Sequence, residues 1–127
     1  MRLFVVRHAQ AAPGDPDAMR PLTAQGREVA RAVGAQLAAT QPDAVLCSPL
    51  LRARETAAPI ANAAGVEAEP DERLAPGATA ADIREAVQGR GGTVVVVGHQ
   101  PDCSEIVLEL SGREVKFEPG AVVEVEL

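Results

Sequence analysis

The chain has 127 residues, which fits one domain spanning residues 1–127, and 46% of them are hydrophobic, enough for a sizeable core. Its net charge of −6 and its lack of Tyr and Trp argue against a nucleic-acid-binding surface. It has no apolar segment of signal-peptide type and no apolar run of membrane-spanning length, and we expect Cys47 and Cys103 to be reduced core residues. These features predict a cytoplasmic monomer that does not bind membranes.

The first half of the chain predicts two strands and two helices. Residues 1–6, MRLFVV, form a short apolar run that is typical of a strand buried on both faces. A loop rich in Pro and Gly follows, and Thr23 caps a helix that runs to about residue 39. DAVLCS predicts the second strand. We expect the next helix to have Ser48 as its N-cap, to be kinked or shortened by Pro59 and to end at Gly65.

The second half continues the alternation. A brief strand is predicted near VEAEP, then a helix over roughly 79–88, and GGTVVVVG predicts a buried strand. A helix capped by Asp102 and ended by Gly112 follows. The tail from Val115 to Leu127 alternates apolar and charged residues, which predicts a hairpin.

Apolar strands alternating with helices predict an α/β fold, a three-layer α/β/α sandwich around a mostly parallel sheet without an inserted lid domain. Ligands of such sheets bind at the carboxyl ends of the strands. His8 and His99, the only two histidines, each follow a strand, and Ser48 follows the second strand. We therefore expect three separate segments to meet in one crevice.

The charges expected in that crevice favour an anion. Arg7 precedes His8, Arg52 lies at the start of the helix after Ser48, and Arg20 closes the long first loop. Several cations without a carboxylate partner repel one another unless they bind an anion, and guanidinium groups suit phosphate oxygens. A neutral histidine could then attack phosphorus and form a phosphohistidine, which water hydrolyses. His99 and Cys103 are four residues apart, but nothing completes a metal site, and we expect neither metal nor cofactor.

Three segments carry a resemblance to a known family. RHA at 7–9, SPLLRARETA at 48–57 and GHQP at 98–101 resemble, in order and context, the motifs of the histidine phosphatase superfamily, whose fold is phosphoglycerate mutase-like. The small size, the RPLTAQG segment at 20–26 and the tail resemble its SixA-type phosphohistidine phosphatases. The resemblance implies that His8 is the nucleophile and that Arg7 and Arg52 bind the phosphoryl oxygens. It also implies that His99 stabilises these oxygens and that Arg20 contacts phosphate or substrate.

The sequence departs from the family pattern in two places. Ala9 stands where the superfamily usually has glycine, and we expect its methyl group to narrow the turn beside the phosphate. Many members also have a glutamate general acid between the second and third motifs. Glu72 is the best match to it, and the other candidates are Glu69, Asp71, Asp15 and Asp17, all of which could be solvated loop charges.

The absence of a clear general-acid candidate affects which substrate we expect. Alcohol phosphoesters need a positioned acid, whereas a phosphorylated imidazole leaves as neutral imidazole, whose conjugate acid has a pKa of about 6.5. We therefore expect a metal-independent phosphatase that acts on phosphohistidine in a partner protein. A general small-molecule phosphomonoesterase is the alternative among enzymes, and a catalytically weak phosphoprotein-binding module is the alternative of another class.

Overall fold

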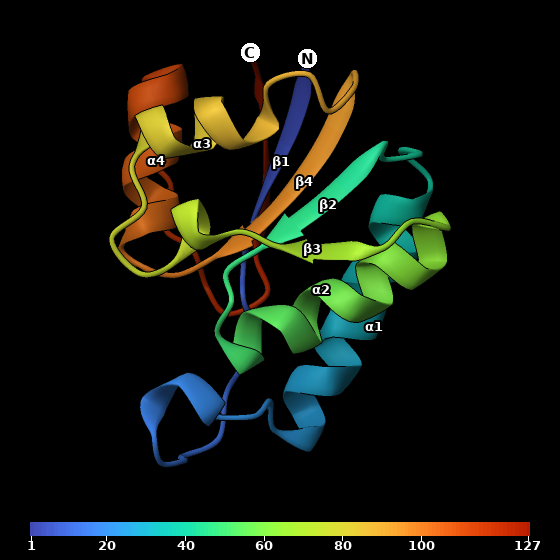
Figure 1. Ribbon diagram of the computed structural model, residues 1–127, viewed down its shortest axis with the longest axis vertical. Helices are drawn as coiled ribbons and strands as arrows, with labels where there is room; N and C mark the ends of the chain where they lie inside the picture. Colours follow the sequence, from blue (N-terminus) through green and yellow to red (C-terminus); the bar gives the residue numbers. More distant parts are fainter.

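The computed structural model describes all residues from 1 to 127 and has a central sheet with helices on both faces (Figure 1). The fold class expected from the sequence, a mostly parallel α/β/α sandwich, is confirmed. The strands are β1 (Arg2–Arg7), β2 (Ala44–Cys47), β3 (Ala68–Pro70), β4 (Thr93–Gly98) and β5 (Val122–Glu126). The α-helices are α1 (Ala24–Ala38), α2 (Leu51–Ala64), α3 (Ala80–Val87) and α4 (Asp102–Ser111), and two short 3-10 helices are η1 (Asp17–Met19) and η2 (Glu72–Leu74). No helix has the length and apolar character needed to cross a membrane.

The sheet order is β3-β2-β4-β1-β5, and only β5 is antiparallel to its neighbour. β1 and β4 are parallel neighbours in a register that pairs Arg7 with Gly98 at their carboxyl ends. The residues that follow these two, His8 and His99, therefore leave the sheet side by side. Strand β2, which ends one residue before Ser48, lies on the other side of β4.

Both faces of the sheet are covered, which explains the uninterrupted valines of β4. Val95 and Val97 pack with residues of α1 and α2 in one core cluster, whereas Val94 and Val96 pack with residues of α3 and α4 in another. Side chains alternate between the two faces of a strand, so a strand buried on both faces is apolar at every position. Figure 1 shows the two helix pairs on opposite sides of the sheet.

The helix ends follow local rules in several places. The Thr23 side chain accepts a hydrogen bond from the Gly26 amide and caps α1, and Thr79 forms a capping box with Asp82 at the start of α3. Gly65 ends α2 and Gly112 ends α4, each in the left-handed conformation that glycine adopts at little cost.

The start of α2 differs from the prediction. The helix begins at Leu51, and its N-cap is Leu50 instead of Ser48. The Ser48 hydroxyl accepts a hydrogen bond from the Leu50 amide, in a turn that precedes the helix. Of the two effects expected of Pro59, a kink or a shortened helix, shortening does not occur, because α2 continues to Ala64. The buried residues after the proline pack into the core, and this packing offsets the lost backbone hydrogen bond.

Two predictions about the last third of the chain are also wrong. Asp102 does not cap α4, because its carboxylate accepts hydrogen bonds from the Gly77 and Ala78 amides at 2.8 and 3.2 Å. The tail does not form a hairpin, because β5 pairs directly with β1 and residues 113–118 form no strand. Phe117 is buried in the core, and a single buried residue in an irregular segment imitates the alternation of a strand.

Candidate active site

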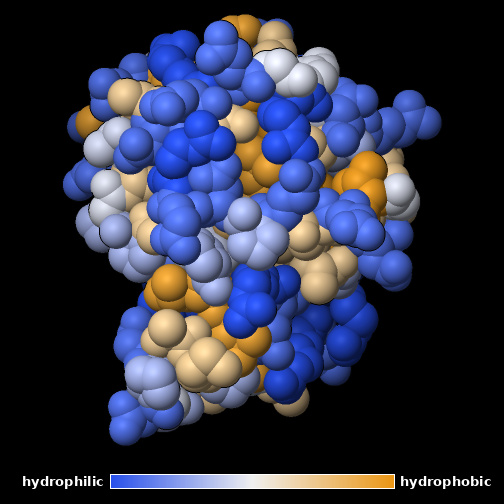
Figure 2. Space-filling model, in the orientation of Figure 1, coloured by the Kyte–Doolittle hydropathy of each residue, from blue (hydrophilic) through white to orange (hydrophobic).

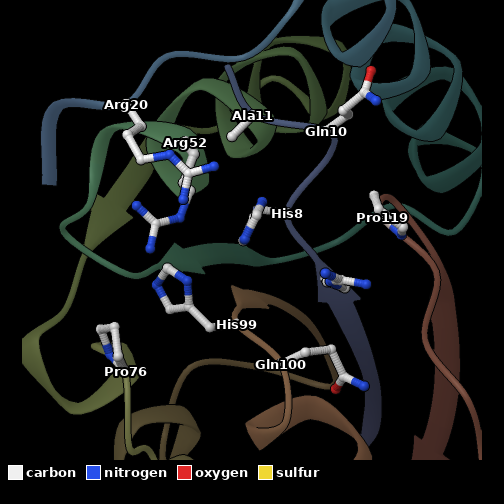
Figure 3. A pocket seen from close by; sticks show the side chains of 10 residues that line it. His8, Gln10, Ala11, Arg20, Arg52, Pro76, His99, Gln100 and Pro119 are labelled. Atoms are coloured by element: carbon white, nitrogen blue, oxygen red, sulfur yellow. The ribbon is translucent and has the colours of Figure 1, made fainter. Parts of the chain in front are cut away.

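A cavity of about 400 Å³ opens at the carboxyl edge of the sheet (Figure 3). It brings together five residues that the sequence predicted for one site: Arg7, His8, Arg20, Arg52 and His99. The rest of the lining is polar or small: Gln10, Ala11, Pro76, Gln100 and Pro119. The lining therefore contains three arginines and two histidines but no carboxylate, which is the composition of an anion-binding site.

The backbone hydrogen bonds around His8 decide which of its ring nitrogens can react. The Nδ1 atom lies 2.7 Å from the carbonyl oxygen of Ala9. A carbonyl only accepts hydrogen bonds, so Nδ1 carries the proton and Nε2 carries the free electron pair. Burial of the ring lowers the pKa of His8, and the charges of Arg52, Arg7 and Arg20 lower it further. His8 is therefore a neutral imidazole at pH 7, with Nε2 free to act as a nucleophile.

His99 faces His8 across the cavity, with the two ring centroids 5.3 Å apart (Figure 3). Its Nε2 atom lies 2.8 Å from the Oγ atom of Ser48, a residue that is fully buried. This oxygen already accepts a hydrogen bond from the Leu50 amide, and its own proton needs an acceptor, which Nε2 provides. His99 then carries its proton on Nδ1. Burial, followed by the nearby His8 and Arg52, lowers the pKa of His99 to about 4, so that it is a neutral donor.

Arg52 and Arg20 reach the cavity from different elements and meet at the same acidic residue. Arg52, 7% exposed, donates from Nη1 to the main-chain oxygen of Asp17 (3.0 Å) and from Nη2 to its carboxylate (3.2 Å). Arg20 donates from Nε to the Ala12 carbonyl (3.0 Å) and from Nη1 to the carboxylate of Asp17 (3.4 Å). The Arg20 hydrogen bond is the main reason that the pKa of Asp17 lies below its usual value. Helix η1 thereby connects two of the three arginines.

Arg7 is held by the tail of the chain. Its Nη1 atom donates to the carbonyl oxygen of Phe117 at 2.9 Å, and its Nε atom is buried and has no hydrogen-bond partner. The amide of Gly120 donates to the carbonyl oxygens of Arg7 and His8 at 3.0 and 3.2 Å. The segment expected to form a hairpin therefore supports Arg7 and His8 instead.

Ala9, expected to narrow the turn beside the phosphate, does not line the cavity. The residue is fully buried, and its methyl group belongs to a small core cluster with Leu22 and Ala30. Its amide donates to the Thr56 hydroxyl at 3.0 Å, and this hydroxyl donates to the carbonyl of Arg52 at 2.8 Å. Ala9 and Thr56 are thus packing residues that connect the turn after β1 to α2.

The structure does not bring the acid candidates into the cavity. Glu72 lies on η2, where its exposed side chain lines a separate shallow hollow with Arg73 and Asp82. The two other acid candidates in that part of the chain are paired on the surface, Glu69 with Arg90 and Asp71 with Arg73. Of the acidic residues considered from the sequence, only Asp17 contacts residues that line the cavity.

Sequence reasoning missed three contributions to the site. Ser48 was expected to be a helix cap, but it bonds to His99. Asp17 was considered only as an acid, although it pairs with Arg52. The backbone of 117–120 was not expected near the site at all. The contribution of Ser48 could have been found, because the residue directly follows a buried strand. The contributions of Asp17 and of the backbone of 117–120 depend on contacts between distant segments, which leave no local signal in the sequence.

Comparisons with known proteins agree with this geometry. Residues 3–76 match the sequence pattern of the histidine phosphatase superfamily (branch 1). An uncharacterized protein of Mycobacterium tuberculosis is 38% identical over 115 residues, which cover 84% of this chain and 70% of that protein. A phosphohistidine phosphatase SixA homolog of Haemophilus influenzae is 29% identical over 143 residues, which cover 98% of this chain and 87% of that protein. The solved structure of the protein histidine phosphatase SixA complexed with tungstate superposes with a TM-score of 0.88, at 28% identity, and covers 100% of this chain and 88% of that one.

The match extends over more than half of the chain and includes the two motifs that contain His8 and Arg52. The likeness in structure covers the whole chain, the third motif with His99 included. The chain belongs to the histidine phosphatase superfamily, is of the SixA type within it, and is a phosphatase.

Proposed function

We propose that this phosphatase removes phosphoryl groups from phosphohistidine in a partner protein, through a phosphohistidine intermediate on His8 and without a metal ion. The observation that carries the proposal is the hydrogen bond from His8 Nδ1 to the Ala9 carbonyl. It leaves Nε2 unprotonated in a cavity lined by three arginines and a second histidine. Such an arrangement is suited to accept a phosphoryl group on nitrogen.

In the first step Nε2 of His8 attacks phosphorus. The bond from phosphorus to the substrate nitrogen breaks, and its electron pair stays with the leaving imidazole. Arg7, Arg52 and Arg20 stabilise the negative charge on the phosphoryl oxygens, and Nδ1–H of His99 donates to one of them. Water then attacks phosphorus on the side opposite His8, the bond from phosphorus to Nε2 breaks, and its electron pair returns to His8. The proton that the water loses passes to the solvent, and inorganic phosphate is released. The arginines supply the positive charge that a divalent cation supplies in many other phosphatases.

The lining of the cavity favours an imidazole leaving group. An alkoxide needs a proton from a general acid, and none of the lining residues is a carboxylic acid. Asp17, which pairs with two of the lining arginines, has a lowered pKa and is ionised at neutral pH, so it is a poor acid. A phosphoimidazole protonated on its second nitrogen leaves as a neutral molecule and needs no such proton.

The surroundings of the cavity favour a phosphoryl group presented on a protein surface. No domain is inserted between the second and third motifs, where the chain passes through β3, η2 and α3. Met19, one of two large apolar side chains that are well exposed, directly precedes Arg20 in the loop beside the cavity. Apolar side chains gather over the lower part of the face shown in Figure 2, where Figure 1 places this loop together with α1 and α2. Exposed apolar groups beside a polar cavity are suited to contact a protein substrate.

The experiment compares two substrates, a phosphohistidine-bearing carrier protein and an aryl phosphate, for the wild type and His8→Ala in the presence of a chelator. We expect the wild type to remove the phosphoryl group of the carrier protein much faster and His8→Ala to be inactive while it still binds phosphate. Faster turnover of the aryl phosphate would favour a small-molecule phosphomonoesterase. Absence of turnover with either substrate would favour a phosphoprotein-binding module, and loss of activity with the chelator would contradict a metal-independent mechanism.

A further inference from the structure

The carboxylate of Asp17 occupies donors that a phosphoryl group at this site would use. Its two oxygens lie 3.2 Å from Nη2 of Arg52 and 3.4 Å from Nη1 of Arg20. Both arginines line the cavity, whereas Asp17, on η1, is not one of the lining residues. Its side chain is 65% exposed, so the carboxylate is a solvated negative charge paired with two arginines of an otherwise cationic cavity.

The main chain of Asp17, rather than its side chain, provides the shorter contact to Arg52. Nη1 of Arg52 lies 3.0 Å from the carbonyl oxygen of Asp17, and the contacts of the carboxylate are longer. Arg20 likewise has a second partner, the Ala12 carbonyl at 3.0 Å. Replacement of the carboxylate by an amide leaves both main-chain contacts in place. The contribution specific to the Asp17 side chain is therefore its negative charge.

We propose that Asp17 is a specificity-determining residue of this site, whose negative charge disfavours free phosphate and phosphomonoesters relative to phosphohistidine; this inference rests on the proposed function. A phosphate monoester carries a charge between about −1.5 and −2 at neutral pH, and nothing in its leaving group offsets that charge. A phosphohistidine protonated on its second ring nitrogen carries a positive charge on the side that faces away from His8, toward solvent. A carboxylate paired with the arginines of the cavity repels the first class of ligand and attracts the ring of the second.

This charge also favours release of the product. Inorganic phosphate binds the same arginines as the substrate phosphoryl group but lacks the imidazolium ring. When phosphate leaves, the Asp17 carboxylate is in place to neutralise Arg52 and Arg20, as it does in the structure. Competition between an internal carboxylate and a bound anion lowers the affinity for the anion by the free energy of the displaced contacts.

The test uses Asp17→Asn, which removes the charge and keeps the shape, beside Asp15→Asn as a matched control. Asp15 lies in the same loop, and the ion pairs to Arg20 and Arg52 come from Asp17 alone. Three quantities are measured for each protein: the inhibition constant of inorganic phosphate, kcat/KM for an aryl phosphate, and kcat/KM for the phosphohistidine carrier protein. Thermal unfolding of each variant confirms that it is folded.

For Asp17→Asn we expect phosphate to inhibit about threefold to tenfold more tightly. The ratio of kcat/KM for phosphohistidine to that for aryl phosphate should fall by a similar factor, and both effects should shrink at high ionic strength. Asp15→Asn should match the wild type. An unchanged or weaker phosphate inhibition in Asp17→Asn, or an equal loss with both substrates, would overturn the inference and leave only a positioning role. If the wild type itself fails to turn over phosphohistidine, the proposed function fails, whatever the variants do.

Discussion

The buried hydroxyl of Ser48 lies 2.8 Å from Nε2 of His99 and connects the end of β2 to the residue that follows β4. This contact sets the ring orientation of His99 and, with Nε2 as the acceptor, leaves the proton on Nδ1. A positioned donor is effective because it loses no free energy in reorganising when charge develops on the phosphoryl oxygens.

Replacement of this hydroxyl should affect catalysis more than stability. In Ser48→Ala the His99 ring loses its fixed tautomer and orientation, and we expect kcat to fall by about tenfold to a hundredfold. Ser111→Ala is the control, since it removes a serine hydroxyl that bonds to the Val107 carbonyl at the far end of α4. Steady-state kinetics and thermal unfolding of both variants provide the check. Equal kcat values in the two variants would show that Ser48 does not position His99.

Two arginines of α2, two positions apart, should respond very differently to truncation. Arg52 is buried and lines the cavity, whereas Arg54 is exposed and lies outside its lining. We expect Arg52→Ala to lower kcat/KM by about a hundredfold or more, because a guanidinium that stabilises the transferring phosphoryl oxygens is lost. Arg54→Ala should stay close to the wild type. The measurement is kcat/KM for phosphohistidine, and a similar loss in both variants would point to a general effect of the charge of α2.

The pH dependence of kcat/KM should reflect the lowered pKa of His8. Burial is the main cause of the shift, and the charges of Arg52, Arg7 and Arg20 add to it. The nucleophile must be neutral, and a lowered pKa keeps it neutral below the ordinary value of 6.5. Activity should therefore persist as the pH falls from 7 through 6.5 and decline only below that.

A variant tests whether the charge of Arg52 contributes to the lowered pKa of His8. Arg52→Ala removes one cation near His8, so the acid limb of its residual activity should move to higher pH. Circular dichroism at each pH separates titration from unfolding. An acid limb at 6.5 or above in the wild type would contradict the assignment of a lowered pKa to the nucleophile.

A side chain at Gly26 should destabilise the protein. A Cβ atom at this position of α1 would collide with the carbonyl oxygen of Gln10, a residue that lines the cavity. Because the obstacle is backbone, Gly26→Ala has to displace the turn after His8 or the first turn of α1. We expect a loss of about 1–3 kcal/mol in the free energy of unfolding together with reduced activity.

Gly92→Ala is the matched control for this substitution. A Cβ atom at Gly92 meets nothing within 4 Å. Denaturant unfolding of both variants measures the difference in stability. A Gly26→Ala variant as stable as Gly92→Ala would show that the turn adjusts without cost.

Much of the fold could be predicted from the sequence because its signals are local. The four valines of β4, the Thr23 cap and the terminal glycines Gly65 and Gly112 each predicted the element that the structure contains. The meeting of His8 and His99 could also be predicted, because parallel strands present their carboxyl ends at one edge. The predicted hairpin of the tail was wrong because alternation does not say which strand is the partner.

The sequence by itself determined which residue types gather at the sheet edge, and these predicted an anion-binding site with two histidines. Only the tertiary structure decided how each group is used. The reactive nitrogen of His8, the partner of His99 and the pairing of Asp17 with two arginines all depend on hydrogen bonds between segments that are distant in the chain or on local backbone geometry. A sequence pattern records which side chains are present and how they are spaced, whereas the direction of a hydrogen bond depends on where the folded backbone places its donors and acceptors.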